Sequence, residues 1–241
     1  MELRRFFVLP SDISGDEVIL RGDEFAHMTR VLRMKKGFKV IVCADDGTER
    51  LCTVKDIFSD SASLAVDEVN RVDRKSADVT LYCGLLKNQK LDFVVQKAVE
   101  LGIDRIIPFV SDNSAETRFN TERARRIALE AAKQCGTAYL SQVCDPVKFD
   151  DVLADFPQYT DVLFAYERER KNPVRNTDFK GRKIALVVGS EGGFTEAEYR
   201  KALECGARSV TLGRRILRAE TADIVLCALI LDTLGELDYD E

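Results

Sequence analysis

The feature that most constrains the fold of this chain is an apolar run that ends in a cluster of glycines. Ile184 to Val188 is typical of a strand buried on both faces of a parallel sheet. The run leads directly into Gly189-Ser190-Glu191-Gly192-Gly193. Glycines in such a loop can adopt positive φ and let backbone N–H groups approach a ligand closely. The pattern therefore predicts a binding site at the carboxyl edge of a parallel sheet.

A capping box follows the glycine loop. Thr195 and Glu198 have the spacing that closes the first turn of a helix, so we expect a helix from about Glu196 that ends at Gly206. The glycine spacing alone is weakly specific. It matches neither the P-loop, G-x-x-x-x-G-K-[ST], nor the G-x-G-x-x-G dinucleotide fingerprint, and the same glycines could simply form a tight turn.

A second strand and loop come next. We expect a strand from Ser209 to Gly213, then the loop 214–218, and then an apolar helix from about Glu220 to Leu234. Two neighbouring strand ends would thus carry loops large enough to hold a ligand. The last helix has apolar residues on nearly every side, so we expect it to be buried within its own domain or against a second subunit.

The chain before this stretch alternates between strands and helices. The pattern predicts strands at 79–86, 105–110, 140–144 and 162–166, and helices at 91–101, 121–135 and 149–156. Such alternation is typical of an α/β domain with a mostly parallel sheet. The polar segment 71–78 marks a linker, so we expect one domain at 1–72 and a second at 73–241.

The first 72 residues have a different pattern. Short strand-like runs, at 5–9, 18–20, 39–43, 51–58 and 62–69, are separated by turn residues, and Asp45-Asp46-Gly47-Thr48 has the Asp-Gly chemistry of a hairpin. One helix, from about Asp23 to Met34, interrupts the strands. This pattern predicts a small β-barrel with one helix.

Composition excludes several classes of protein. The seven cysteines include no C-x-x-C pair, and there is only one histidine, which argues against a zinc site and a disulfide framework and favours reduced thiols in a cytoplasmic protein. The start of the chain lacks the apolar segment of a secretory signal, and the longest apolar run, Ile224 to Leu231, is far shorter than the ~20 residues of a membrane span. The formal net charge of −5 is unusual for a nucleic-acid-binding protein.

Basic residues are nevertheless concentrated near the N-terminus. His27, Arg30 and Arg33 lie three residues apart on the predicted helix, and Arg4 and Arg5 could extend the same surface. We expect these residues to bind RNA phosphates. The alternative is an ordinary solvated helix face with a structural histidine.

Several segments resemble the bacterial 16S rRNA (uracil-N3)-methyltransferase family, and together they span the whole chain. They are GSEGGF at 189–194, LGRRILRAETA at 212–222, RRFFV at 4–8, HMTRVLRM at 27–34 and QKAVELG at 96–102. The resemblance implies a SPOUT-class α/β domain, whose C-terminal chain forms a trefoil knot around S-adenosyl-L-methionine, after a PUA-like RNA-binding domain. It also implies a homodimer that packs its last helices together and methylates 16S rRNA in the decoding region. Methyl transfer from a sulfonium is an in-line displacement, so we expect no metal.

The resemblance also implies roles for individual residues. Backbone groups would hold the cofactor at Gly189, Glu191, Gly192, Leu212, Gly213, Ile216 and Leu217. Lys87 and Lys97 would lie near the RNA, although Lys97 could simply pair with Glu100. For catalysis we expect Arg218 to stabilise the uracil anion and Glu220 or Glu191 to accept or orient a proton, although Glu220 could equally serve as the acidic residue of a helix N-terminus.

Three positions depart from the family pattern. Ser190 replaces the usual proline of the glycine loop, and Thr137 and Asn113 stand where arginines are common. These changes bear on the target RNA more than on the cofactor. Two other functions therefore stay open: a SPOUT methyltransferase that acts on tRNA or on a ribose 2′-hydroxyl, and an RNA-binding module without catalysis.

Overall fold

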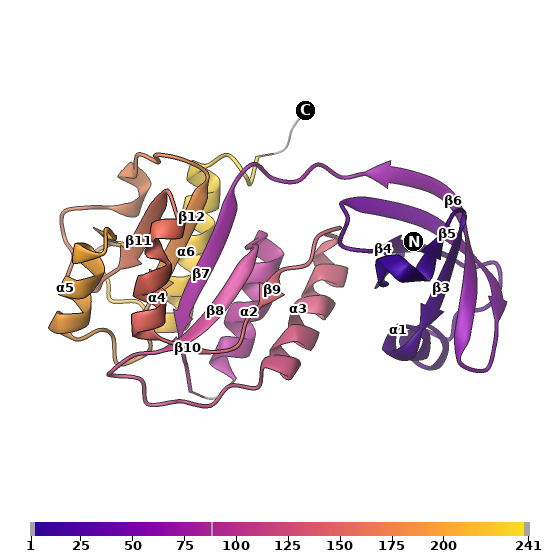
Figure 1. The fold of residues 1–241 in the computed structure, drawn as a ribbon, viewed down its shortest axis with the longest axis horizontal. Coiled ribbons are helices and arrows are strands. Elements are labelled where there is room, and N and C mark those ends of the chain that lie inside the picture. Colours follow the sequence, from indigo (N-terminus) through magenta and orange to yellow (C-terminus); the bar gives the residue numbers. More distant parts are fainter. Residues whose placement is uncertain (1–2, 88, 239–241) are drawn as a thin grey trace. The chain divides into compact units, whose positions relative to one another are not determined.

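The computed structural model describes residues 3–87 and 89–238 (Figure 1). The chain forms two compact units. The first contains the residues up to 74 together with 132–140, and the second contains 75–131 and the residues from 141 onward. The domain boundary after residue 72 stays a prediction, and Asn88 lies outside the described residues.

The first unit contains a six-stranded curled sheet. Its strands are β1 (Arg4–Phe7), β2 (Ile13–Ser14), β3 (Glu17–Arg21), β4 (Lys39–Cys43), β5 (Thr48–Ile57) and β6 (Ser61–Arg71). The spatial order is β1-β4-β5-β6-β3-β2, and all pairs are antiparallel except β1 with β4. Phe6, Leu20, Met28 and Leu64 are fully buried in its core. The predicted small β domain is confirmed.

The predicted hairpin between β4 and β5 is also confirmed. Asp45 and Gly47 both have positive φ, at 55° and 67°, and Asp46 accepts a hydrogen bond from the amide of Thr48 at 3.0 Å. Asp and Gly tolerate this backbone region better than other residues do, which is why the dipeptide could be read from the sequence.

The helix expected at 23–34 is shorter and less regular than predicted. The α-helix α1 (Gly22–Ala26) continues as a π-helical turn, His27–Val31, in which the amide of Leu32 bonds to the carbonyl of His27. Arg33 then adopts φ of 52°, a left-handed conformation that ends the helix before Met34. Residue periodicity assumes 3.6 residues per turn, so a π turn cannot be read from it.

The second unit is built on a parallel sheet. Its strands are β7 (Asp78–Gly84), β8 (Arg105–Val110), β9 (Gln142–Val143), β10 (Val147–Lys148), β11 (Asp161–Ala165), β12 (Lys183–Val188) and β13 (Arg208–Val210). They lie in the order β10-β8-β7-β12-β11-β13, and β9 also pairs with β8. The predicted parallel α/β sheet is confirmed.

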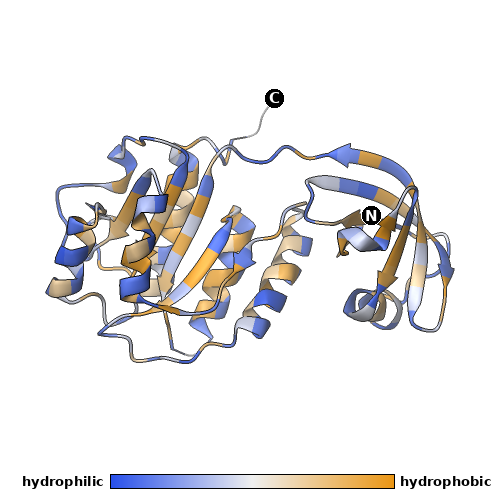
Figure 2. Cartoon of the chain, viewed as in Figure 1, coloured by the Kyte–Doolittle hydropathy of each residue, from blue (hydrophilic) through white to orange (hydrophobic). Residues whose placement is uncertain are grey.

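Five helices accompany this sheet. They are α2 (Lys90–Leu101), α3 (Thr121–Cys135), α4 (Phe149–Asp155), α5 (Glu196–Glu204) and α6 (Ala219–Thr233). α2 ends at Gly102 and α5 is followed by Gly206, both at positive φ, as the sequence predicts. In Figure 2 the strands of the sheet are largely orange, whereas α3 and α5 alternate between orange and blue, because each of these two helices buries only one face.

An aromatic cluster anchors the glycine loop to this core. The rings of Phe109, Phe149, Phe164 and Phe194 pack against one another, with centroids 4.3 Å apart for Phe164 and Phe194. Phe194 is the residue that follows the glycines, and it is 6% exposed. Burial of this ring fixes the end of the loop to the sheet.

The strand order brings the two predicted loops together. β11 lies between β12 and β13, so the chain crosses β11 as it passes from β12 through α5 to β13. Because all three strands are parallel, their following loops meet at one edge of the sheet. The trefoil knot itself stays a prediction. Among the described residues, no helix is long and apolar enough to cross a membrane.

Candidate functional site

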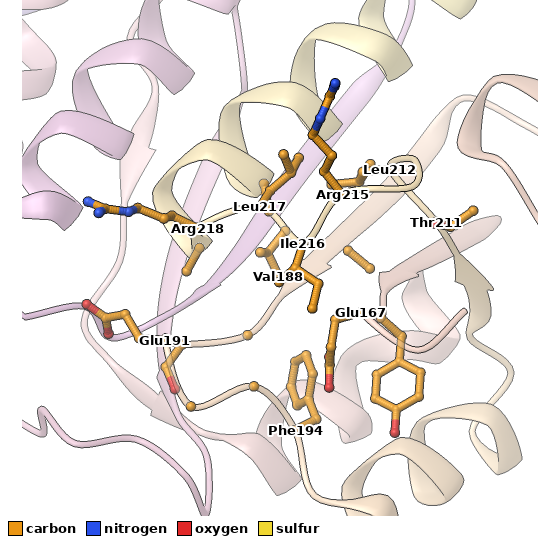
Figure 3. Close-up of a pocket in the computed structure, with 18 of the residues that line it drawn as sticks. Glu167, Val188, Glu191, Phe194, Thr211, Leu212, Arg215, Ile216, Leu217 and Arg218 are labelled. Carbon is orange, nitrogen blue, oxygen red and sulfur yellow. The ribbon is translucent and has the colours of Figure 1, made fainter. Parts of the chain in front are cut away.

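A cavity of about 470 Å³ opens at the carboxyl ends of β11, β12 and β13 (Figure 3). Its size lies within the range of small-molecule sites, roughly 300–1,000 Å³. Its lining includes every residue expected to hold the cofactor, namely Gly189, Glu191, Gly192, Leu212, Gly213, Ile216 and Leu217, and also Arg218. The structure thus brings both predicted loops into one pocket.

Close packing, and not only turn geometry, requires the glycines of the first loop. A Cβ atom on Gly189 would lie 2.8 Å from the ring of Phe194, and one on Gly192 would lie 2.5 Å from the carbonyl oxygen of Asn113. Both distances are too short for real side chains. The side-chain amide of Asn113 also donates to the carbonyl of Gly192 at 3.2 Å. The loop is therefore supported from behind by the turn that follows β8.

The buried carboxylate of Glu198 ties the glycine loop to that same turn. Glu198 is 5% exposed, and its Oε2 accepts hydrogen bonds from the amide and the hydroxyl of Thr195, at 2.8 and 3.0 Å. Its Oε1 accepts a third from the amide of Asp112 at 2.8 Å. The predicted capping box is confirmed. Its acidic residue, Glu198, also binds the amide of Asp112.

The second loop forms the opposite wall of the cavity. Ile216 is 77% exposed, and in Figure 3 its side chain extends toward Glu167 and Phe194. Arg215 points away from the cavity. An exposed isoleucine beside a buried ring leaves an apolar gap that suits a flat apolar group.

Charged side chains gather at one end of the cavity. The Nζ atom of Lys90, on the first turn of α2, lies 2.9 Å from Oε1 of Glu191 and 3.7 Å from Oε2 of Glu220. The amide of Lys87 also donates to Oε1 of Glu191, at 3.2 Å. Although partial burial raises the pKa of Glu191, the hydrogen bonds from Lys90 and from backbone amides outweigh burial and leave this pKa below its ordinary value.

The two predicted catalytic residues lie close to this charged end. Arg218 is the N-cap residue of α6 and lines the cavity, and Glu220 lies in the first turn of α6. Within the described residues, the guanidinium of Arg218 makes no hydrogen bond or ion pair. Glu220 thus occupies the helix N-terminus and also contacts Lys90. Its catalytic role stays a prediction.

Two residues of this pocket were not singled out from the sequence. Glu167 follows β11 and faces the cavity beside Phe194 (Figure 3). Lys90 belongs to the lining at the charged end. An acidic residue just after a parallel strand is a signal that could have indicated Glu167. Lys90 follows a strand and begins a helix, which indicates the ligand side of the sheet. Its partners cannot be read from the sequence, because they lie about 100 and 130 positions further along the chain.

The predicted RNA-binding residues differ in their surroundings. Arg4, Arg30 and Arg33 are exposed. Arg5 is not: its side chain is 8% exposed and lies 2.7 Å from Glu49. His27 is half-buried, with its ring edge against Phe6 at a centroid distance of 6.1 Å.

The two predicted lysines of the second unit also differ. Lys87 is exposed, whereas Lys97 donates to both carboxylate oxygens of Glu100 at 2.8 Å, which is the ion pair that the sequence left open. In the part of the chain that the structure describes, no cluster of histidine, cysteine or acidic residues could hold a metal ion.

Comparison with known proteins gives matches over both units. A family model described as an RNA methyltransferase domain matches residues 73–231, and one described as an RNA methyltransferase PUA domain matches residues 20–67. Ribosomal RNA small subunit methyltransferase E of Bacillus subtilis (strain 168) is 32% identical over 225 residues, which cover 88% of this chain and 88% of that protein. The protein of the same name from Mesomycoplasma hyopneumoniae (strain 232) is 31% identical over 166 residues, which cover 67% of this chain and 72% of that protein.

A solved structure is also similar along nearly the whole chain. It is the crystal structure of a ribosomal RNA small subunit methyltransferase E from Neisseria gonorrhoeae bound to S-adenosyl methionine. Its TM-score is 0.84 at 27% sequence identity, and the match covers 96% of this chain and 98% of that one.

Proposed function

This chain belongs to the ribosomal RNA small subunit methyltransferase E family, and on that premise we propose that it methylates N3 of a uridine in 16S rRNA with S-adenosyl-L-methionine as methyl donor. The observation that carries the proposal is the cavity that the two loops after β12 and β13 enclose. Because these loops form its walls, they would hold a donor between them, and Arg218 and Glu220 stand at the charged end of the same cavity.

The cavity fits the cofactor by shape and by chemistry. The apolar gap between Ile216 and Phe194 suits the flat adenine ring, and the carboxylate of Glu167 beside it suits the ribose hydroxyls. The glycine loop offers backbone groups without side chains in the way. We therefore add Glu167 to the proposed cofactor-binding residues, together with Gly189, Glu191, Gly192, Leu212, Gly213, Ile216 and Leu217.

The chemistry needs a nucleophilic nitrogen and a stabilised anion. When bound, S-adenosylmethionine supplies a methyl group on a positively charged sulfur. Uridine N3 carries a weakly acidic proton between two carbonyls, and in our proposal Glu220 accepts this proton. Arg218 donates to O2 or O4, where the negative charge of the uracil anion collects. Its guanidinium, which has no partner among the described residues, has its donors available for this role.

The proposal also includes partners. Arg30 and Arg33, with Arg4 and Lys87, would contact RNA phosphates, whereas Arg5 would first have to leave its ion pair with Glu49. Ile224, Val225, Ala228 and Leu229 on α6 are apolar and only half-buried, which supports a homodimer through this helix. We place the enzyme in the cytoplasm, with the rRNA of the small ribosomal subunit as its substrate.

The direct test compares small-subunit rRNA from a strain that has this protein with rRNA from one that lacks it. We expect one uridine in the decoding region to lose a methyl group, as measured by mass spectrometry of rRNA fragments, and purified protein with S-adenosylmethionine to restore it. A methyl group lost from a tRNA or from a ribose would instead support a different RNA target. If S-adenosylhomocysteine does not bind in calorimetry, the site is not a cofactor site at all.

A further inference from the structure

Lys90 is the only side chain of the pocket lining that contacts carboxylates from two separate segments, among the residues that the structure describes. It belongs to α2, whereas Glu191 belongs to the loop after β12 and Glu220 to the first turn of α6. These segments lie far apart in the sequence, and both carboxylates reach the same ammonium group. Lys90 is 32% exposed at its side chain, Glu191 30% and Glu220 15%, so the ammonium group lies at the rim of the cavity. Oε2 of Glu220, which faces it, is buried and has no hydrogen-bond partner among the described residues.

At this end of the cavity the number of positive charges equals the number of negative charges only if Lys90 is included. Two cations, Lys90 and Arg218, stand with two carboxylates, Glu191 and Glu220. Both carboxylates contact Lys90, and within the described residues neither is hydrogen-bonded to Arg218. Like charges repel, so without Lys90 the two carboxylates would face each other without a cation between them. The other cation at this end of the lining is Arg218, and pairing with it would turn the guanidinium away from the substrate.

Resting on the proposed function, we infer that Lys90 is a positioning residue for methyl transfer. It gathers the carboxylates of Glu191 and Glu220 and so leaves Arg218 free to face the uracil. The ion pair of Lys90 with Glu191 is partly exposed, and such pairs change folding little, so we expect this residue to act on geometry more than on stability. Its effect is geometric: it decides which cation the two carboxylates bind.

The test is a comparison of variants in steady-state methylation of small-subunit rRNA. Lys90→Met should lower kcat by roughly ten-fold or more, since general acid–base catalysis contributes about 10²–10⁴-fold and depends on placement. KM for the RNA should change by less than about three-fold. Lys90→Arg, which keeps the charge, should recover most of the rate. The melting temperature should move by no more than about 2–4 °C.

The double variant Lys90→Met/Glu191→Gln separates positioning from a structural role. With Glu191 neutralised, only the carboxylate of Glu220 remains to bind Arg218 and turn it away from the uracil. We therefore expect this variant to be faster than Lys90→Met alone. Lys201→Met is the matched control, because Lys201 is also a helical lysine paired with an acid, Asp150 at 3.5 Å, and does not line the cavity. It should behave as the wild type.

The outcomes distinguish this inference from the proposed function. If the wild type methylates rRNA and Lys90→Met has an unchanged kcat, the inference is wrong and the proposed function stands. Equal rates for Lys90→Met and the double variant would also overturn it, because the decrease would then not come from the carboxylates. If the wild type itself methylates no rRNA, the proposed function fails before Lys90 is tested.

Discussion

At the scale of single residues, Asp223 has the most unusual surroundings. It lies on α6 one turn after Glu220, is 1% exposed, and neither of its carboxyl oxygens has a hydrogen-bond partner among the described residues. Burial, and secondarily the charge of Glu220, raises the pKa of Asp223 well above its ordinary value. The folded chain therefore favours the protonated acid.

The first prediction concerns the pH dependence that this raised pKa causes. An unfolded Asp223 ionises above about pH 4, whereas the folded one keeps its proton, so the stability that this residue contributes is greatest below pH 4 and falls as the pH rises toward the folded pKa. Asp223→Asn cannot ionise. At pH 7 its free energy of unfolding, measured by urea denaturation, should exceed that of the wild type by about 1 kcal/mol or more. Near pH 3 this difference should vanish. An asparagine variant that is less stable at pH 7 would mean that Asp223 is ionised and paired.

The second prediction concerns the packing of Gly192. A methyl group there would collide with the carbonyl oxygen of Asn113, which is backbone and cannot rotate away. Gly192→Ala should therefore displace the loop and weaken S-adenosylhomocysteine binding by roughly ten-fold or more in calorimetry. Gly102→Ala, at the end of α2, is the control: it strains a positive φ of 88° but has open space around it, so it should lower stability without changing affinity.

The residues of the site could be predicted only in part. The glycine loop, the capping box and the arginine of the second loop follow local rules, so the sequence and the family resemblance indicated them. Lys90 and Glu167 act through neighbours from distant segments, which no single-segment pattern records. Arg5 shows the reverse: a basic residue next to an aromatic strand suggested RNA binding, yet its guanidinium is buried beside Glu49.

At the scale of elements, α5 is the helix on which the glycine loop depends. The third prediction compares its two capping residues. Thr195→Ala should cost about 1 kcal/mol of unfolding free energy, as for other N-caps. Glu198→Ala should cost more, about 2–3 kcal/mol, because it leaves the amides of both Thr195 and Asp112 without their shared acceptor.

Urea denaturation of the purified variants would measure both changes in stability. Glu204→Ala, at the exposed end of the same helix, should stay within about 0.5 kcal/mol of the wild type. Equal changes for the two capping variants would show that the bond from Asp112 contributes nothing.

Long elements could be predicted, and short ones only in part. The strands expected at 140–144 and 209–213 are observed as the shorter β9 (Gln142–Val143) and β13 (Arg208–Val210). The residue pattern predicts α3 at its observed range, Thr121–Cys135, and places β4 and β8 at their observed bounds. It does not reveal β2 or β10, because two-residue strands have no period and exist only through their partners. The π turn after α1 and the parallel pairing of β1 with β4 are set by tertiary packing in the same way.

At the scale of the whole molecule, an acidic chain must bind RNA through local charge. The net charge is −5, so attraction has to come from exposed cations such as Arg30 and Arg33. The fourth prediction is that Arg30→Glu/Arg33→Glu weakens binding to small-subunit rRNA and makes its logarithmic salt dependence shallower, by roughly 0.7–0.9 for each phosphate that these arginines no longer neutralise.

Filter binding or fluorescence anisotropy over a salt series would measure this change. Arg200→Glu/Lys201→Glu is the matched control, since it alters the net charge equally at exposed positions of α5, which belongs to the second unit. A similar weakening in both variants would mean that overall charge, and not the surface of Arg30 and Arg33, controls binding.

The order of strands also has a consequence for folding. Both walls of the cavity come from residues 165–222, and β13 pairs with β11, which lies between it and β12. The place for a methyl donor therefore exists only when all three strands are assembled. A donor bound there would oppose any opening of this end of the sheet.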